Sequence, residues 1–548
     1  MNKGFLIIAI VVIFAGALIG GIFGRLPGGM PAADSKLTTQ SVINEYSEAL
    51  ELIEKNYVNE IKHEEVLESS IQSMLWTLDP HSSFFTRDEF RKLQEDQSSQ
   101  FYGIGVSIVR YRDGVYVQSV IPGTPADKEG LHFGDKFSEV EGKDATDWTG
   151  AEVSQNVRGE QGTPVNIKVN RAGAKEPLDF KIVRGGVPLP SIRNYFMLND
   201  SVGYVGLSGG FQETTAAELD TAIADLKTKG MKSLLLDLRG NPGGLLPQAI
   251  EVTSRFIPSG QTVVSVKGRT KFSQARDLKA VGNNMFDFPL VVMINGGSAS
   301  ASEIVAGAIQ DYGRGLVVGS DSFGKGLVQR VFPLPYGTGL TLTTARYYTP
   351  YGRSLQRDYS NGSIYEYYTH SNPNDEENVD ETKDAKPKPK GTAIKTAGGR
   401  VFYGGRGIEP DLNAPGLAFT PLRSRINEAT FFFARQLSAG NVKGFENYKT
   451  DKQTFTMTVK PDDLQISDGL FEAFVSYIIS DEQNGLTRAN INSQSKYAKS
   501  RLREQLATAK YSGEAGQQVF IENDPQVLKA IDALPEAKKL VQTIMVKK

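Results

Sequence analysis

A long apolar run stands near the start of the chain. From Gly4 to Gly24 no residue is charged, and most residues are Ile, Leu, Val, Ala or Phe. As a helix this run would extend roughly 30 Å, about the thickness of one hydrocarbon core. A helix buried in a globular core would need polar positions, so we expect residues 4–24 to form a transmembrane anchor or signal segment. The length favours a retained anchor, whereas Pro31-Ala32-Ala33 would suit a signal peptidase.

An amphipathic pattern follows in residues 35–95, which we expect to form a small helical region. Apolar side chains recur at spacings of three and four residues, at Ile43, Tyr46, Leu50, Ile53 and Tyr57. This spacing predicts a helix with one apolar face. A second helix is predicted by the apolar positions Ile71, Leu75 and Leu78. Asp79-Pro80 ends it, and His81 follows, where a lone histidine is most often a structural hydrogen-bonding residue.

Short apolar runs predict a β-rich domain over residues 101–184. Turns at Arg112-Asp113-Gly114 and Pro122-Gly123 separate the runs. The apolar positions are Val106, Ile108, Val115, Val117 and Val120. A Gly-x-Gly segment opens the domain, and its main-chain N–H groups are free to receive a carboxylate.

Together with three later turns, this segment makes the domain resemble a PDZ domain. The turns are Gly123-Thr124-Pro125-Ala126, Gly130-Leu131 and Gly134-Asp135. PDZ domains bind an extended C-terminal peptide as an added strand and hold its carboxylate with main-chain donors. The resemblance implies that Gly103, Ile104, Gly105 and Val106 bind the tail of a peptide.

Strands alternate with helices in residues 185–415, which predicts an α/β layer structure. The predicted strands are Val202–Leu207, Ser233–Leu236, Thr262–Val266, Pro289–Ile294 and Leu316–Val318. The predicted helices are Thr214–Leu226, Gln248–Phe256 and Ser302–Gln310. A polar segment without apolar periodicity, Ser371–Gly391, is predicted to be a mobile insertion.

Residues 416–548 are predicted to form a helical C-terminal region. The best segments are Asn427–Leu437, Leu470–Ile479, Tyr497–Tyr511 and Asp524–Leu534. The last has Asp524 as a cap and Pro525 in its first turn, a strong helix-start signal. The sequence does not choose between shielding an active site, dimerisation and partner binding as the role of this region. The whole pattern is that of a multidomain α/β protein.

Charge and residue types narrow the chemistry. The formal net charge is −2, from 61 basic and 63 acidic residues, so no basic field points to nucleic acid. The chain has no cysteine, which excludes disulfides and thiol chemistry. No histidine and glutamate spacing typical of a metal site occurs. We therefore expect neither a metal nor another cofactor.

Two segments carry the candidate chemistry. Residues 295–303 read N-G-G-S-A-S-A-S-E after an apolar run, and residues 322–329 read S-F-G-K-G-L-V-Q. None of the four histidines lies near either segment. A nucleophile here would be a serine, with Lys325 as its base. A lysine base must be neutral, so burial would have to lower its pKa by about three units.

A third segment, Asp237–Gly244, reads D-L-R-G-N-P-G-G after an apolar strand, and its glycines allow close approach of main-chain N–H groups to a ligand. It lacks the spacing of a phosphate-binding loop. In this order behind a PDZ-like domain, the three segments resemble the C-terminal processing peptidases, also called tail-specific proteases. The resemblance covers about residues 35–415, including Thr349-Pro350 and Gly407–Asp411. It implies a crotonase-like α/β peptidase core and a serine endopeptidase that trims proteins near their C-termini.

The resemblance also implies roles for single residues. Ser300 matches the family's nucleophile, Lys325 its general base, and Gln329 the glutamine that orients the lysine. The oxyanion donors would be the main-chain N–H groups of Gly244 and Ala301. Glu303 matches the family pattern too, without an assigned role.

Partners and location follow from the same features. We expect protein or peptide substrates with free C-termini, no nucleic acid, and contact with the membrane through the N-terminal segment. The catalytic region would be extracytoplasmic, periplasmic in a cell envelope, whether anchored or released by cleavage. Arg158, in an Arg-Gly-x-x-Gly-Thr stretch, is a candidate for coupling tail binding to catalysis, with a surface ion pair as the alternative. A homo-oligomer or an adaptor protein as partner stays open.

Two other functions fit part of the sequence. A PDZ-bearing envelope scaffold with a degenerate peptidase core would have no use for an intact Ser300 and Lys325. A crotonase-like acyl-CoA enzyme would share the layered core, but it would not explain the PDZ-like domain. Covalent labelling of the serine would separate these functions from a peptidase.

Overall fold

The computed structural model describes residues 37–97, 99–282, 285–359, 367, 391–396, 399–456 and 458–546. The predicted membrane segment, residues 4–24, and residues 371–390 of the predicted insertion lie outside these ranges. Within the described ranges, no helix is both long and apolar enough to cross a membrane. The chain forms two compact units, residues 1–70 and residues 71–548.

The described part of the first unit is helical. Helix α2 (Thr39–Asn56) is capped by Thr38 and confirms the first predicted helix. Its apolar side chains, Ile43, Tyr46 and Ile53 among them, are exposed. Helix α3 (His63–Trp76) begins earlier than the predicted second helix, because its first turn carries charged residues rather than apolar ones. Helix α4 (Arg87–Gln97) follows in the second unit.

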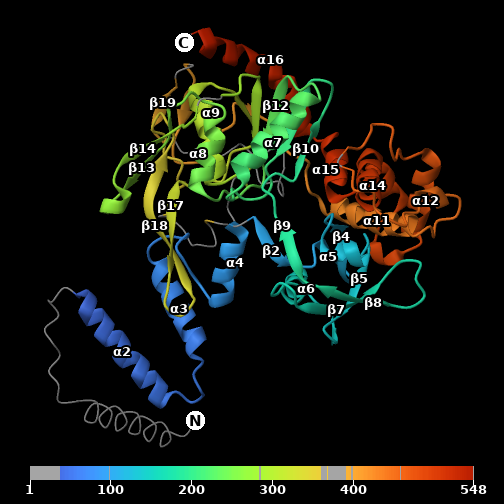
Figure 1. Ribbon diagram of the computed structural model, residues 1–548, viewed down its shortest axis with the longest axis horizontal. Coiled ribbons are helices and arrows are strands. Elements are labelled where there is room, and N and C mark those ends of the chain that lie inside the picture. The colour runs from blue at the N-terminus through green and yellow to red at the C-terminus, as the bar shows by residue number, and fades with distance from the viewer. Residues whose placement is uncertain are drawn as a thin grey trace, which may run out of the picture. The chain divides into compact units, whose positions relative to one another are not determined.

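The PDZ domain is built on a twisted antiparallel sheet with two short helices (Figure 1). The strand order is β3-β4-β5-β7-β8, and β6 pairs with β5. The elements are β3 (Val106–Tyr111), β4 (Gly114–Val120), α5 (Pro125–Glu129), β5 (Lys136–Val140), β6 (Lys143–Asp144), α6 (Gly150–Val157), β7 (Pro164–Asn170) and β8 (Leu178–Val183). Strand β3 is an edge strand, so its outer side can accept a further strand. A separate pair, β2 (Gln100–Gly103) and β9 (Gly185–Pro188), joins the two ends of the domain.

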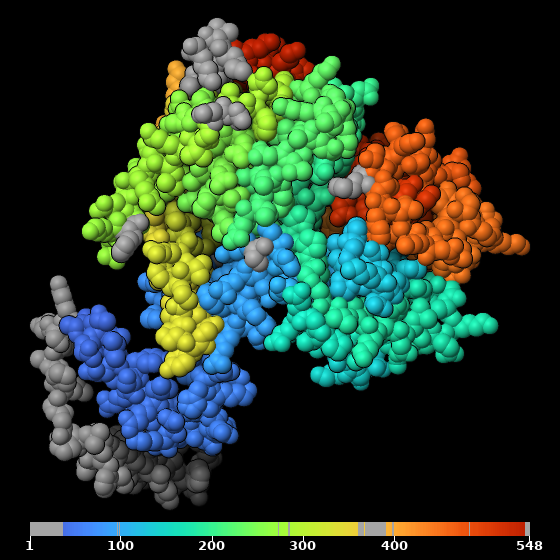
Figure 2. Space-filling model, in the orientation of Figure 1, coloured from blue at the N-terminus to red at the C-terminus, as the bar shows by residue number. Residues whose placement is uncertain are grey.

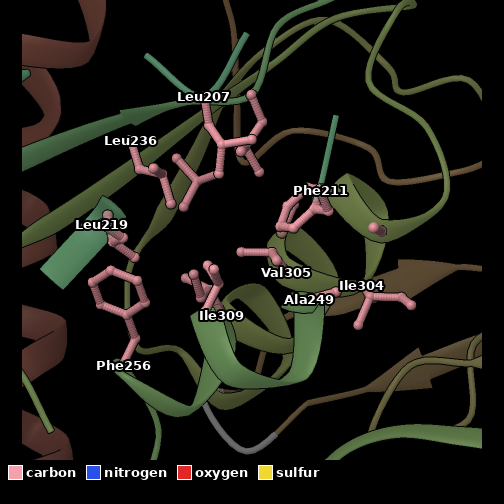
Figure 3. Close-up of a cluster of buried hydrophobic side chains, with 14 of the residues drawn as sticks. Leu207, Phe211, Leu219, Leu236, Ala249, Phe256, Ile304, Val305 and Ile309 are labelled. Atoms are coloured by element: carbon pink, nitrogen blue, oxygen red, sulfur yellow. The ribbon is translucent and has the colours of Figure 1, made fainter. Parts of the chain in front are cut away.

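The main sheet of the core has six strands in the order β10-β11-β12-β15-β16-β21, parallel except for β10. The strands are β10 (Asn194–Met197), β11 (Val202–Gly206), β12 (Ser233–Asp237), β15 (Leu290–Ile294), β16 (Leu316–Gly319) and β21 (Leu412–Asn413). Helices α7 (Thr215–Thr228), α8 (Leu246–Ser254) and α9 (Ala301–Tyr312) pack on one face. In Figure 3, Leu207 and Leu236 of the strand side point toward Leu219, Phe256 and Ile309. These elements confirm the predicted helices and four of the predicted strands.

Alternate side chains of the same strands face the opposite side of the sheet. There Tyr204, Leu235, Val291 and Met293 form a second apolar cluster with Val527, Ala530 and Leu534 of helix α16 (Pro525–Val546). The parallel strands are therefore buried on both faces, as continuous apolar runs predict.

The fifth predicted strand, Thr262–Val266, is confirmed as β13 (Thr262–Gly268) but lies in a different sheet. That sheet has the order β1-β18-β13-β14, with β17 on β18, and all its pairs are antiparallel. Its other strands are β1 (Ser83–Phe85), β14 (Arg276–Lys279), β17 (Leu327–Pro333) and β18 (Gly339–Tyr348). A small pair, β19 (Ala393–Lys395) and β20 (Val401–Tyr403), lies nearby in the chain. Local alternation predicts a strand but not its partner, and the partner β18 comes much later in the chain.

The C-terminal region is helical, as predicted. Its helices are α11 (Pro421–Ser438), α12 (Asp468–Ile479), α13 (Arg488–Ser493), α14 (Ser495–Lys510), α15 (Gly513–Ile521) and α16. Helices α11, α12 and α14 share one apolar cluster with Tyr116 and Phe133 of the PDZ domain. In Figure 2 the orange atoms of the helical region lie against the cyan atoms of the PDZ domain. Arg239 of the core donates to Asp524 and Gln526 at the start of α16, at 2.7 Å in both cases.

Candidate active site

Ser300 lies between the buried strand β15 and helix α9. It is the N-terminal cap of α9, with φ 55° and ψ −111°. A positive φ is rare for a residue with a side chain and stores strain, which is common at functional sites. Two serines tie this turn to the segment after β12. Ser298 Oγ donates to Leu238 O at 2.8 Å, and Ser302 Oγ donates to Asn241 O at 3.0 Å.

The buried carboxylate of Glu303 ties Ser300 to the Lys325 segment. It accepts hydrogen bonds from Ser300 N at 2.8 Å, Lys325 N at 2.9 Å, Gly324 N at 2.8 Å and Ser322 Oγ at 2.5 Å. Burial raises the pKa of Glu303, and these donors act in the opposite direction. Each of the two carboxyl oxygens accepts two of these hydrogen bonds. Glu303 therefore fixes the distance between the two segments of candidate chemistry.

The side chain of Lys325 is partly buried, and its amine is hydrogen-bonded. Its Nζ donates to Oε1 of Gln329 at 2.7 Å. Gln329 is four residues later in the chain, in strand β17. Burial lowers the pKa of Lys325, while the charges of Glu303 and Asp79 raise it by smaller amounts. The net direction is the one that a lysine base requires. The Nε2 of Gln329 donates in turn to the main-chain oxygen of His81.

A buried tyrosine connects the nucleophile candidate with the base candidate. Tyr347 of β18 donates its hydroxyl to the main-chain oxygen of Lys325. Burial raises the pKa of Tyr347 well above its ordinary value, and a hydrogen bond with the Ser300 side chain acts against this. Among the described residues, no hydrogen bond joins Ser300 Oγ directly to Lys325 Nζ. Such bonds are often long without substrate and tighten when it binds.

The loop after β12 closes over the start of α9. Asn241 anchors it, donating through Nδ2 to Leu207 O and Gly209 O, both at 2.7 Å. A Cβ on Gly243 would lie 2.7 Å from the Cβ of Ser300, and one on Gly244 would lie 2.3 Å from Phe211 O. Only glycine allows the loop to come this close.

This close approach leaves two main-chain donors beside Ser300. Within the described residues, neither the N–H of Gly244 nor that of Ala301 has a hydrogen-bond acceptor. The N–H of Ala301 is also at the N-terminus of α9, where unpaired donors favour a negative charge. The two predicted oxyanion donors thus come from two segments, Gly244 from the loop after β12 and Ala301 from the first residue of α9.

The predicted tail-binding residues form the loop between β2 and β3. Gly103 ends β2, Val106 begins β3, and Gly105 has φ 90°. The carbonyls of Ile104 and Gly105 accept from Ala126 N and Ile121 N, at 2.8 and 3.0 Å. Their own N–H groups have no acceptor among the described residues. The loop can therefore receive a carboxylate next to the open edge of β3.

Arg158 lies at the end of α6, beside this loop. Its guanidinium is 4.1 Å from the centre of the Phe101 ring, which follows the geometry of a cation–π contact. This contact is with an aromatic ring, and the coupling role of Arg158 stays a prediction. A cavity of about 910 Å³ begins at Phe101 and Arg158 and extends to Arg239 and Gly240 of the loop after β12.

From the sequence, Glu303 was named without a role and His81 as a structural hydrogen-bonding residue, and Tyr347 was missed. The position of Glu303 has a further sequence signal, because a serine followed three residues later by glutamate at a helix start is a capping box. Tyr347 carries no local signal, since its role depends on the pairing of β17 with β18. His81 contributes through its main-chain oxygen, which no side-chain pattern reveals. The described residues contain no cluster of His, Cys, Asp and Glu that could hold a metal ion.

Comparisons with known proteins add to this geometry. Residues 103–182 match the family model of the PDZ domain, and residues 201–362 match that of peptidase family S41. The chain is 37% identical over 348 residues to a carboxy-terminal-processing protease of Bartonella bacilliformis, covering 62% of this chain and 79% of that protein. It is 32% identical over 356 residues to the carboxy-terminal processing protease CtpA of Bacillus subtilis, covering 65% of this chain and 75% of that protein. A solved structure, the photosystem II D1 C-terminal processing protease, is 28% identical, with a TM-score of 0.33 and coverage of 58% of this chain and 91% of that one.

Proposed function

The chain belongs to peptidase family S41 and is a C-terminal processing serine protease with a PDZ domain, and on this premise we propose that Ser300 and Lys325 form its catalytic dyad. The observation that carries the proposal is the shared carboxylate of Glu303, which binds the main chain of both residues. It holds a strained serine and a partly buried lysine of lowered pKa in one rigid arrangement.

In the proposed reaction, Ser300 Oγ attacks the carbonyl carbon of the scissile peptide bond and gives its proton to Lys325. The lysine passes that proton to the leaving amine, the C–N bond breaks, and an acyl-enzyme ester remains on Ser300. Water then attacks the ester carbon and gives a proton to Lys325. Lys325 returns this proton to Ser300 Oγ as the ester C–O bond breaks, and the product with its new C-terminal carboxyl group leaves. The N–H groups of Gly244 and Ala301 stabilise the oxyanion in both halves. Gln329 orients the amine of Lys325 by accepting a hydrogen bond from it.

We further propose that the PDZ domain selects substrates by their free C-terminus. The tail carboxylate would accept from the N–H groups of Ile104 and Gly105, and the tail would pair with the open edge of β3. Arg158 would couple binding of the tail to the active site. It lies beside Gly103, and it lines the cavity that extends to the loop after β12.

The location of the enzyme is also a proposal. The uncharged apolar run 4–24 supports membrane targeting. We place the catalytic region on the periplasmic side of a cell envelope, although the charges next to the run, Lys3 and Arg25, do not set its orientation. Fractionation of cells that express the full chain, or the chain without residues 4–24, tests it. Equal recovery of both forms in the cytosol would reject membrane targeting.

The dyad is tested by turnover of an unstructured protein with an apolar free C-terminus. Ser300→Ala and Lys325→Ala should each lower turnover by about 10³-fold or more with the fold unchanged, since members of one catalytic unit act together. Ser480→Ala and Lys443→Ala, in the C-terminal region, are the matched controls. Wild-type turnover by either dyad variant would reject the assignment. Tail selection is tested separately with the same substrate amidated at its C-terminus, which should be cut more slowly.

A further inference from the structure

We propose that the turn Asp79–Ser82 is a positioning element for the catalytic base. It fixes the side-chain amide of Gln329 in the one orientation that presents an acceptor to Lys325. This inference rests on the proposed role of Lys325 and names a part of the chain, before the PDZ domain, that controls it. His81, the residue at the centre of the turn, acts through its main-chain oxygen.

The hydrogen bonds of Gln329 carry the argument. Its Nε2 donates to His81 O, and its Oε1 accepts from Lys325 Nζ at 2.7 Å. A main-chain carbonyl can only accept. If the amide rotated by half a turn, its oxygen would meet the His81 oxygen and its NH₂ would meet the lysine amine. The carbonyl of His81 therefore excludes the rotated form and leaves an oxygen facing Lys325.

This orientation matters because a neutral lysine has one lone pair. With one of its N–H bonds directed at Gln329 Oε1, rotation about the last carbon–nitrogen bond is restricted. The lone pair is then limited to fewer directions, and one of these directions can point toward the side chain of Ser300. Without this acceptor the amine would sample all its rotations, and proton transfer from serine requires the correct one.

The turn itself is rigid. The carboxylate of Asp79 accepts from His81 N at 2.8 Å, from Ser82 N at 2.9 Å and from Ser82 Oγ at 2.8 Å. Ser82 Oγ also accepts from Thr343 N of β18 at 3.1 Å. Strand β1, which begins directly after the turn, pairs with β18. The carbonyl of His81 is thus fixed to the same sheet that carries Gln329.

The ring of His81 closes the other side of the turn. It is buried, and its Nε2 is 2.9 Å from the hydroxyl of Tyr367. It packs edge-on against the rings of Tyr367 and Phe323, with centroids 5.3 and 6.3 Å away. Phe323 N donates to Ser298 O at 2.9 Å, so the turn also supports the segment between Ser322 and Lys325.

The turn is part of the charge environment of the base. Lys325 is faced by Glu303 of α9, by Asp79 and His81 of the turn, and by Tyr347 of β18. The Asp79 charge raises the pKa of Lys325 and opposes the larger effect of burial. Replacing Asp79 with a neutral residue of the same shape should therefore shift the pH limb of kcat to lower pH.

A double-mutant cycle on the full chain tests the inference. Asp79→Ala removes the acceptor that holds the turn, and we expect it to lower kcat by about 10- to 100-fold with KM unchanged, as for a small misplacement of a catalytic group. In the Gln329→Ala background, Asp79→Ala should have no further effect on kcat, because the residue through which the turn acts is gone. The matched control is Asp88→Ala, at an exposed aspartate of α4 outside the turn, whose kcat should stay at the wild-type value.

The cycle distinguishes a positioning role of the turn from a purely structural role. If Asp79→Ala lowers kcat equally with and without Gln329, the turn is only structural and the inference is wrong. An effect confined to KM would also overturn it. If Asp79→Ala does not fold, the same cycle with Ser82→Ala, which removes the contact to Thr343, decides in the same way. If Lys325→Ala keeps wild-type turnover, the proposed dyad fails instead, irrespective of the cycle.

Discussion

Tyr116 of the PDZ domain and Phe431 of α11 pack edge to face, with ring centroids 5.4 Å apart and ring planes at 75°. Phe431 is fully buried, and Phe133 lies 5.0 Å from it on a centroid basis. Arg435, one turn later in α11, donates to Gly134 O at 2.6 Å and to Asn170 O at 2.8 Å. The PDZ domain and the helical region therefore share one core, on the side of the domain away from α6.

Removing this shared core should uncouple the two regions. Phe431→Ala is expected to lower the free energy of unfolding by about 3–5 kcal/mol, the usual cost for a fully buried phenylalanine. Unfolding in denaturant, followed by fluorescence, measures the change. Phe419→Ala, at an exposed position just before α11, is the control and should stay within about 0.5 kcal/mol of wild type. A loss below about 1 kcal/mol for Phe431→Ala would mean that the regions fold independently.

The loop after β12 should tolerate an added methyl group at Gly240 but not at Gly243. Gly243→Ala places a Cβ 2.7 Å from the Ser300 Cβ and 2.9 Å from Ala301 N, so kcat should fall by about 10²-fold or more. Gly240→Ala is the control, because it also has a positive φ but meets nothing within 4 Å. Similar kcat values for the two variants would show that the clash is irrelevant and that only backbone strain matters.

The activity should rise with pH as Lys325 loses its proton. Burial lowers the pKa of Lys325, so the limb of kcat/KM should lie below the value of about 10.4 for a free lysine. The charge of Glu303 raises that pKa, and Glu303→Gln removes the charge. The limb should consequently move to lower pH, together with a lower plateau from the lost contacts. Rates measured from pH 6 to 10 check this; a limb that moves upward would contradict the assignment.

His81 should make the protein less stable in mild acid. Burial, followed by the charge of Lys325, lowers the pKa of His81 to about 4. Between an unfolded pKa of about 6.5 and this folded value, the unfolded chain binds a proton that the native chain does not, so stability falls as pH falls through that window. His81→Gln removes the titration, and the stability difference between wild type and variant should change by up to about 3 kcal/mol between pH 7 and pH 4. A difference that is constant with pH would contradict the lowered pKa.

Arg158 should affect selection more than chemistry. With Arg158→Gln, the preference for a free over an amidated C-terminus should shrink by about 10-fold, because the contact over Phe101 is worth about 1–2 kcal/mol when partly buried. Cleavage of the amidated substrate should stay near the wild-type rate. An equal loss for both substrates would place Arg158 in the structure of the site rather than in tail recognition.

Sequence patterns predicted the local elements of this protein better than their partners. The apolar runs at Val202–Leu207 and Pro289–Ile294 predict strands because buried parallel strands are apolar on both faces. Thr262–Val266 has a similar pattern, yet it joins an antiparallel sheet, because its neighbour Gly339–Tyr348 is specified by residues far along the chain.

The candidate site shows the same division. Lys325 and a serine of residues 298–302 stand out by residue type, whereas the choice of Ser300 and the role of Gln329 came from the family resemblance. The structure brings their segments together. Glu303 matched the family pattern, but the sequence assigned it no role. Tyr347 and the carbonyl of His81 enter the site through strand pairing. Because every residue has a main-chain oxygen, the residue type at position 81 does not predict this contact.

The position of α16 sets the order in which the enzyme can become complete during synthesis. A nascent chain that ends at Asn413 already contains every strand of the main sheet, but one face of that sheet is still uncovered. The cover arrives only with Val527 to Leu534, and with it Asp524, which binds Arg239 in the loop that carries Gly244. Completion of the core therefore depends on the last helix of the described chain, whatever the order in which the other elements fold.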